Sequence, residues 1–114
     1  MMQDNLFQKI IDRKIPADIV HEDERCLAFR DINPQAPVHV LVIPRKVIRT
    51  HEDIQPEDRE LLGHLHLVAR QLAEQLGVGD GYRLVVNCKE RAGQTVPHLH
   101  MHLLGGRDLH WPPG

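Results

Sequence analysis

The sequence has 114 residues, of which 41% are hydrophobic and 26% are charged, and its formal net charge is -2 with neutral histidines. This length matches an ordinary domain and allows one hydrophobic core without disulfides or a structural metal, so we expect a single domain over residues 1–114. The small negative charge offers no electrostatic footprint for duplex nucleic acid or for an anionic membrane.

The apolar stretches are too short to cross a bilayer, and the first ten residues are too polar for a signal peptide. We therefore expect a cytoplasmic protein without membrane contact. Cys26 and Cys88 lie far apart and form no CxxC pair, which favours two reduced thiols at buried strand positions.

The N-terminal half predicts one short helix followed by strands. Apolar residues at helical spacing from Leu6 to Ile11 indicate the helix, which Asp4 or Asn5 can cap and which the segment IPAD at 15–18 ends. Three strands are predicted next, over residues 19–22, 25–30 and 38–43. The last of them is almost entirely apolar, which is typical of a strand buried on both faces, and Pro44 closes it.

The C-terminal half predicts a long helix from Pro56 to Leu76, with Gly77 as its C-terminal cap. The segment GVGDG at 77–81 lacks the spacing of a phosphate-binding loop and predicts a turn. Strands are predicted over residues 82–88 and 97–104. The order αβββαββ predicts an α+β fold with a mainly antiparallel five-stranded sheet, one long helix and one short helix.

Near the C-terminus, three of the nine histidines alternate with apolar residues: His98, His100 and His102. Side chains alternate between the two faces of a strand, so we expect the imidazoles on one face and Leu99, Met101 and Leu103 in the core. Clustered titratable groups of this kind are seldom accidental, which favours a functional site.

Two kinds of site fit three neighbouring imidazoles. The first is a metal site, but one ion rarely reaches three ligands in a flat row, and no cysteine or carboxylate stands beside them in the sequence. The second is catalysis at phosphorus, in which one unprotonated imidazole attacks while a neighbour manages the proton of the leaving group. Adjacent imidazoles also resist double charging, which separates their protonation states.

The run HLHMHLL at 98–104 resembles the His-φ-His-φ-His-φ-φ signature of the histidine triad (HIT) superfamily of nucleotide hydrolases and transferases. The resemblance covers nearly the whole chain. The segments DERCLAFRDINPQAPVHVLVIPRK at 23–46 and GYRLVVNCKERAGQTVPHLHMHLLGG at 81–106, with the tail HWPPG, resemble its Hint branch, the purine nucleoside phosphoramidases. This implies a HIT-like fold and chemistry without a metal or an organic cofactor.

The resemblance also implies roles for the residues near the triad. His100 would attack the α-phosphorus of a nucleotide and become nucleotidylated, and water would then release the nucleoside monophosphate. His102 would hydrogen-bond the non-bridging phosphate oxygens, whose charge grows in the transition state. His98 and His39 would form a relay behind the nucleophile. Thr95, where the family more often has serine, would help to pass a proton to the leaving amine.

A second group of residues would bind the nucleotide. The resemblance assigns the phosphate to Asn87 and to backbone amides near Gly93 and Gln94, the ribose to Asp31, and the base to Phe7, Ile10 and Ile32. Without the resemblance, the same residues are ordinary strand-end, turn and core positions.

The tail over residues 105–114 is implied to reach the partner of a homodimer. Composition alone favours a frayed terminus. Hint-branch proteins, however, are two-fold dimers whose tails cross toward the neighbouring site, so Trp111 would shape the leaving-group side of the partner's pocket. Leu67 lies off the apolar stripe of the long helix, which also indicates a contact surface.

The leading interpretation is a purine nucleoside 5'-phosphoramidate hydrolase of the adenosine 5'-monophosphoramidase type, which releases AMP or GMP and an amine. Two alternatives stay open: a dinucleoside polyphosphate hydrolase, as in the Fhit branch, and a nucleotide-binding or zinc-binding interaction protein without catalytic activity.

Overall fold

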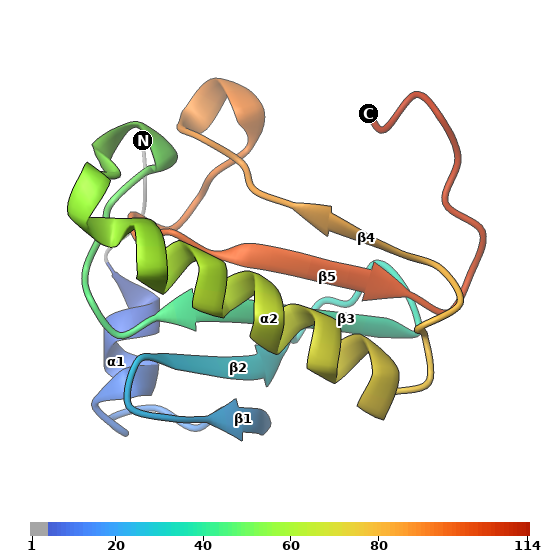
Figure 1. The fold of residues 1–114 in the computed structure, drawn as a ribbon, viewed down its shortest axis with the longest axis horizontal. Coiled ribbons are helices and arrows are strands. Elements are labelled where there is room, and N and C mark those ends of the chain that lie inside the picture. The colour runs from blue at the N-terminus through green and yellow to red at the C-terminus, as the bar shows by residue number, and fades with distance from the viewer. Residues whose placement is uncertain (1–4) are drawn as a thin grey trace.

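The computed structural model describes residues 5–114, which form a five-stranded sheet with a helix against each face (Figure 1). The strand order is β1-β2-β3-β5-β4, and every neighbouring pair is antiparallel. The strands are β1 (Ile19–Glu22), β2 (Cys26–Arg30), β3 (Val38–Pro44), β4 (Tyr82–Val85) and β5 (Met101–Gly105). The helices are α1 (Leu6–Ile11) and α2 (Arg59–Gln75). The predicted α+β fold is confirmed.

The first helix is capped by Asn5, whose Oδ1 accepts a hydrogen bond from the amide of Gln8 at 3.0 Å. The other predicted cap, Asp4, lies outside the described residues. The helix ends at Ile11, and the chain turns through Arg13 at φ 58°, so it stops before Pro16 rather than because of it.

The long helix was predicted from Pro56, but its first turn is a tighter 3₁₀ turn over Pro56–Asp58. Proline is compatible with this turn because its missing N–H falls at a helix start, where no intrahelical partner exists. Along the described chain, no helix is long and apolar enough to cross a bilayer.

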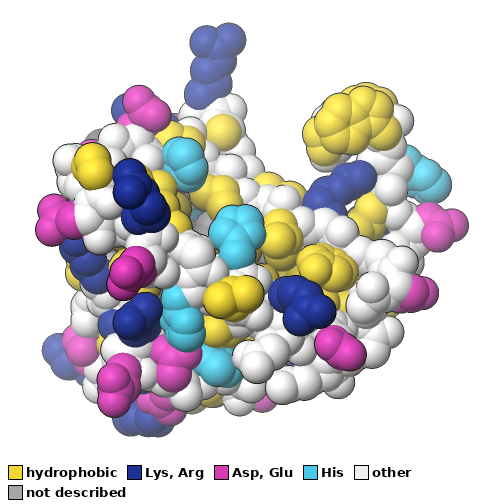
Figure 2. Space-filling view, in the orientation of Figure 1, with side chains coloured by type: hydrophobic (Ala, Val, Ile, Leu, Met, Phe, Trp, Pro, Cys, Tyr) yellow, Lys and Arg dark blue, Asp and Glu magenta, His cyan; other side chains and the backbone are white. Residues whose placement is uncertain are grey.

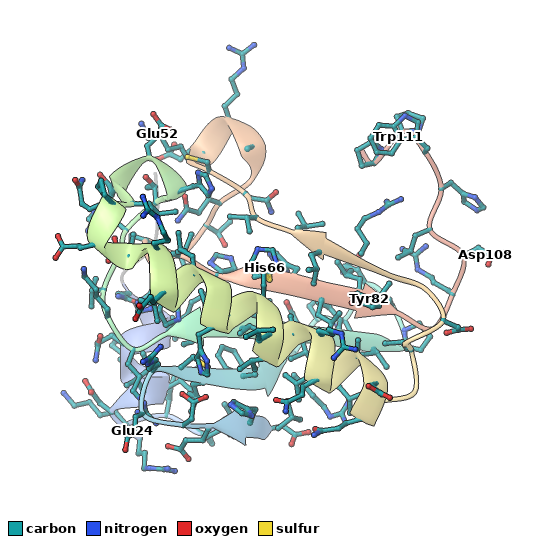
Figure 3. All side chains as sticks on the ribbon, in the orientation of Figure 1. Glu24, Glu52, His66, Tyr82, Asp108 and Trp111 are labelled. Atoms are coloured by element: carbon teal, nitrogen blue, oxygen red, sulfur yellow. The ribbon has the colours of Figure 1, made fainter. Side chains whose placement is uncertain are left out.

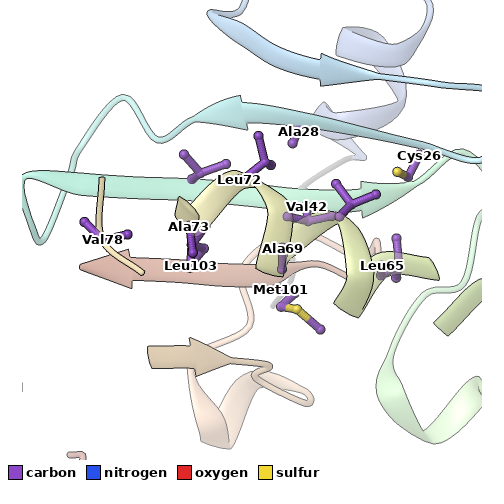
Figure 4. Close-up of a cluster of buried hydrophobic side chains, with 12 residues drawn as sticks. Cys26, Ala28, Val42, Leu65, Ala69, Leu72, Ala73, Val78, Met101 and Leu103 are labelled. Carbon is purple, nitrogen blue, oxygen red and sulfur yellow. The ribbon is translucent and has the colours of Figure 1, made fainter. Parts of the chain in front are cut away.

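The core has two halves, one on each face of the sheet. Alternation along β2 places Cys26 and Ala28 under α2, while Leu27 and Phe29 face α1. Figure 4 shows the α2 half, in which Leu65, Ala69, Leu72 and Ala73 of the helix meet side chains of the sheet. β3 contributes to both halves, as predicted for a strand buried on both faces.

Two strands differ from their predicted bounds by three residues or more. β4 ends at Val85 rather than at residue 88, and β5 begins at Met101 rather than at residue 97. The prediction of one strand with three imidazoles on one face is therefore wrong, because only His102 lies in β5. The cause is Pro44 at the end of β3: it has no N–H for the ladder, and its carbonyl accepts from the side chain of His98.

Candidate active site

His100 presents an unprotonated ring nitrogen at the edge of a pocket. Its Nδ1 lies 2.7 Å from the carbonyl oxygen of His98. A carbonyl only accepts, so Nδ1 carries the proton and the neutral ring keeps its lone pair on Nε2. His100 is only 6% exposed, and this burial lowers its pKa, although the His98 carbonyl and the charge of Asp31 favour the cation. The ring is therefore neutral at neutral pH.

His102 has the opposite tautomer, which a chain of contacts fixes. The amide of Gln35 donates to Nδ1 of His39 at 3.0 Å, so the proton of neutral His39 lies on Nε2. That nitrogen is 2.9 Å from Nδ1 of His102, which must accept. Neutral His102 then carries its own proton on Nε2. Burial, together with His100 and His39, lowers the pKa of His102 to about 4, against the opposing effect of Asp31.

His98 is fully buried and orients the loop rather than facing a ligand. Its Nε2 donates to the carbonyl of Pro44 at 2.7 Å, and its Nδ1 accepts from the side-chain amide of Asn5 at 3.0 Å. The predicted relay of His98 with His39 therefore divides into two separate contacts, because His39 pairs with His102 while His98 reaches His100 through its backbone carbonyl.

The pocket beside the triad has a volume of about 360 Å³ and lies between α1 and the face of the sheet that α1 covers. It brings together seven of the predicted site residues: Phe7, Ile10, Asp31, Ile32, Thr95, His100 and His102. Phe7 packs edge-on against His100, with their ring centroids 4.9 Å apart. Ile32 is 98% exposed, so it offers free apolar surface at the rim. A flat apolar ring fits this wall.

Asp31 has two contacts. One carboxylate oxygen accepts from the amide of Asn33 at 2.8 Å, which is the turn cap that sequence preferences favour. The other lies 3.5 Å from Nε2 of His39. The side chain is half-buried at the pocket wall, so the turn role and a binding role are compatible.

The predicted phosphate-binding amides are already engaged. The amide of Gly93 donates to the carbonyl of Glu90, and that of Gln94 to the carbonyl of Lys89. The buried side chain of Gln94 braces the same loop through the carbonyls of Arg49 and Val96. In the described structure, the amides of Gly93 and Gln94 thus hold the loop in shape. Their assignment to the phosphate stays a prediction.

Asn87 is half-buried and follows the end of β4. Val85 pairs with His102 in the antiparallel ladder. Continuing that register by two residues places Asn87 at the level of His100, although it is not among the residues that line the 360 Å³ pocket.

The same site has three groups that could hold a metal ion. One ligand atom from each of Asp31, His39 and His102 lies within 4.8 Å of the others. No carboxylate stands beside the histidines in the sequence, because Asp31 directly follows β2 and reaches them only through the pairing of β2 with β3.

Trp111 is 82% exposed on the C-terminal tail, far from α1 in the fold (Figures 1 and 3). Arg83 of β4 holds the tail through the carbonyl of His110 at 2.7 Å. Trp111 therefore does not line the pocket of its own chain.

Sequence reasoning missed Asn5 and Pro44 as partners of the triad. Asn5 lies 93 residues from His98, and no spacing rule links the two. The pocket walls from Phe29 and Leu41 could have been found, since both alternate onto the face opposite Cys26 and pair with each other.

The fold and the site define an α+β protein in which paired neutral histidines border a pocket on one sheet face. Residues 12–109 match the model of the HIT domain family, so the chain belongs to the HIT family.

The similarity to relatives extends over all or nearly all of the chain. An uncharacterized HIT-like protein of Synechocystis is 58% identical over 114 residues, covering 100% of both chains. The crystal structure of a HIT family hydrolase of Legionella pneumophila is 52% identical with a TM-score of 0.94, covering 96% of this chain and 98% of that one. A histidine triad nucleotide-binding protein of Candida albicans is 29% identical with a TM-score of 0.81, covering 94% and 82%.

Proposed function

We propose that this protein is a purine nucleoside 5'-phosphoramidate hydrolase of the Hint branch that works through a nucleotidylated His100. The main support is the tautomer of His100, whose proton is held on Nδ1 by the His98 carbonyl so that the lone pair of Nε2 is free. Relatives described as a HIT family hydrolase and as a histidine triad nucleotide-binding protein support hydrolysis and a nucleotide substrate.

In the first step, Nε2 of His100 forms a bond to the α-phosphorus while the bond from phosphorus to the amine nitrogen breaks. The nitrogen keeps the electron pair and takes up a proton, so a neutral amine departs. That proton comes from solvent, and the exposed hydroxyl of Thr95, which lines the same pocket, passes it on. The nucleotidylated ring carries a positive charge, which the hydrogen bond from Nδ1 to the His98 carbonyl stabilises.

In the second step, water attacks phosphorus, and the electron pair of the Nε2–P bond returns to His100. The nucleoside monophosphate leaves with the oxygen of water, and one proton of that water passes to solvent. In both steps negative charge grows on the non-bridging oxygens. His102 stabilises this charge by donating from Nε2, the nitrogen that its contact with His39 leaves protonated.

The purine is placed against Phe7, Ile10 and Ile32, and the ribose hydroxyls against Asp31, because all four line the pocket beside His100. We also assign Asn87 as a hydrogen-bond donor to the phosphate, because the strand register places it at the level of His100.

We also propose a homodimer. β4 is an edge strand, and Leu67 of α2 is 65% exposed. Tyr82 and Val86 are exposed as well, and Figure 2 shows hydrophobic side chains at the surface between α2 and β4. An unpaired edge beside exposed apolar residues is suited to a two-fold contact. The tail with Trp111 then extends toward the partner.

The test compares His100→Ala with Glu74→Ala, a change at an exposed residue near the C-terminal end of α2. We expect His100→Ala to slow hydrolysis of adenosine 5'-phosphoramidate by on the order of 10⁴-fold or more while AMP still binds, because the nucleophile alone is lost. Mass spectrometry of the rapidly quenched wild-type reaction should find a nucleotide adduct on the peptide that contains His100.

An adduct on another histidine would contradict the assigned roles. Equal turnover of wild type and His100→Ala would favour the binding-protein alternative. Faster turnover of a dinucleoside polyphosphate than of the phosphoramidate would favour the polyphosphate hydrolase.

A further inference from the structure

A second cluster of titratable side chains lies on the α2 face of the sheet, and the proposed reaction does not use it. One carboxylate oxygen of Asp23, Oδ2, lies 2.7 Å from Nε2 of His21 and 2.7 Å from Nε2 of His64. The thiol of Cys26 is 3.4 Å from the same oxygen. Three side chains that commonly ligate metals thus surround one carboxylate oxygen, which is itself a possible ligand.

The cluster joins three elements of the fold. His21 comes from β1, Cys26 begins β2, and Asp23 lies in the turn between them. His64 reaches the turn from α2. Figure 4 places Cys26 at the end of the α2 core where Leu65 lies, and β2 alternation directs Cys26 away from the catalytic pocket.

The ligand atoms of His21, Asp23 and Cys26 all lie within 4.8 Å of one another. We propose that these three residues bind a divalent transition-metal ion of the zinc class, with His64 entering from α2 as the fourth ligand. Tetrahedral zinc ligands with bonds of about 2.0–2.3 Å stand roughly 3.3–3.8 Å apart, so the two His–Asp contacts need to widen by about 0.6 Å. His64 lies outside the group of three whose ligand atoms are within 4.8 Å of one another, so it must also move toward His21 and Cys26.

The geometry of Asp23 favours this role. Its other oxygen, Oδ1, accepts from the amides of Arg25 and Cys26 at 2.7 and 2.9 Å. The turn therefore fixes the carboxylate and points Oδ2 at both imidazoles. Oriented in this way, a ligand is held ready by its own hydrogen bonds, as is usual for metal-binding carboxylates.

The charges also balance. Binding releases the proton of the Cys26 thiol, and a thiolate with the Asp23 carboxylate neutralises the two charges of the ion. In the free protein, Nε2 of each imidazole donates to Asp23, so metal binding moves each ring proton to Nδ1 and leaves a lone pair on Nε2 for the ion. Mixed sulfur, nitrogen and oxygen donors are the set that zinc prefers, whereas calcium and magnesium prefer oxygen alone.

An ion can reach the cluster from solvent. Cys26 is fully buried, but the side chains of His21, Asp23 and His64 are each more than a quarter exposed. Burial and the nearby Asp23 charge raise the pKa of the Cys26 thiol to about 12, so the free protein holds it protonated, and metal binding must displace that proton.

The test is a titration of the metal-free protein with Co²⁺, followed by absorption spectroscopy. Thiolate ligation gives a thiolate-to-cobalt charge-transfer band in the near ultraviolet, which ligation by the catalytic histidines and Asp31 cannot give. We expect this band in the wild type and in Cys88→Ser, the matched control at the other cysteine, and its loss in Cys26→Ser.

Two variants at partly exposed positions test the same site without depending on the folding of Cys26→Ser. His64→Ala should weaken Co²⁺ binding at the thiolate band by on the order of 10-fold to 100-fold, as should His21→Ala, while His66→Ala, two residues along α2, should not. Zn²⁺ should raise the melting temperature of the wild type more than that of either variant. Absence of the charge-transfer band from the wild type, or its persistence in Cys26→Ser, would overturn the proposal.

Discussion

At the scale of single residues, the proton positions on the rings of His100 and His102 are set by neutral hydrogen-bond partners rather than by charged ones. A carbonyl fixes the proton of His100 on Nδ1, and the amide of Gln35, acting through His39, fixes that of His102 on Nε2. One ring therefore offers a lone pair and its neighbour a proton. Burial lowers the pKa of both rings and keeps them neutral, which is the form that the proposed reaction requires.

The pH dependence of turnover tests the neutral state of His100. Protonation of Nε2 removes the nucleophile, and burial lowers the pKa of His100 below its usual value of 6.5. We expect the acid limb of kcat/KM for adenosine 5'-phosphoramidate to be half-maximal below pH 6.5. A limb centred at or above that pH would contradict a buried neutral nucleophile.

The stability of the protein should decrease in acid because of the lowered pKa of His102. Its pKa in the folded chain is about 4, against an ordinary 6.5, so the unfolded chain binds more protons between these values. The contribution of neutral His102 is complete above pH 6.5 and is lost as the pH falls from 6.5 toward 4. In urea unfolding, His102→Gln should show a shallower loss over this window than wild type, whereas His66→Gln should follow wild type.

At the scale of elements, helix and strand periodicity sufficed for most of the fold but not for the triad. The bounds of α1 and β1 follow from apolar spacing in the sequence, and Pro44 marks the end of β3. The start of β5 does not, because it depends on a contact between Pro44 and His98 that joins residues 54 positions apart. The period of two in the histidines indicated a strand, although His98 and His100 belong to the loop before it.

The candidate site was likewise predicted only in part from the sequence. The identities of His100, His102, Asp31 and Thr95 were available from the motif and its neighbours, and the pocket brings them together. The partners that set each tautomer were not, since a carbonyl or an amide of the backbone leaves no mark on the sequence. The engaged amides of Gly93 and Gln94 were missed for this reason.

Helix α2 contains a glycine that its packing does not require. A Cβ at Gly63 would meet nothing within 4 Å, and the residue is exposed in mid-helix. Alanine costs less backbone entropy on folding, so Gly63→Ala should raise the free energy of unfolding by about 0.5–1 kcal/mol in urea denaturation.

Gly105 in β5 provides the opposite case. A Cβ there would lie 2.7 Å from Cβ of Val78, in the core half under α2. Gly105→Ala should lower the free energy of unfolding by about 1–3 kcal/mol, since the β-branched side chain of Val78 is tightly packed and cannot move away from the added methyl group. Similar stabilities for the two alanine variants would contradict the packing described here.

At the scale of the whole molecule, the proposed dimer depends on the surface around Leu67. A charge at this position must be buried or exclude the partner, so Leu67→Glu should raise the dimer dissociation constant by roughly 10-fold to 100-fold, or about 1.4–2.8 kcal/mol. Light scattering with size-exclusion chromatography measures this. The matched control is Val47→Glu, at an exposed apolar residue outside α2 and β4. A wild-type protein that is monomeric at micromolar concentration would contradict the dimer.

The tail provides a sharper test of the proposed dimer. Trp111 lies away from the pocket of its own chain, so an effect of Trp111 on turnover would have to come from a partner chain. Trp111→Ala should slow turnover of phosphoramidates with bulky amines, and His100→Ala abolishes the nucleophile. The two variants, Trp111→Ala and His100→Ala, are dissociated, mixed in equal amounts and allowed to reassociate. Half of the resulting dimers then contain one chain of each variant. Each mixed dimer has one site with both an intact His100 and the partner's intact tail. Roughly a quarter of all sites should then regain wild-type turnover. If the mixture shows only the summed activity of its separate components, the tail does not act across the two-fold axis.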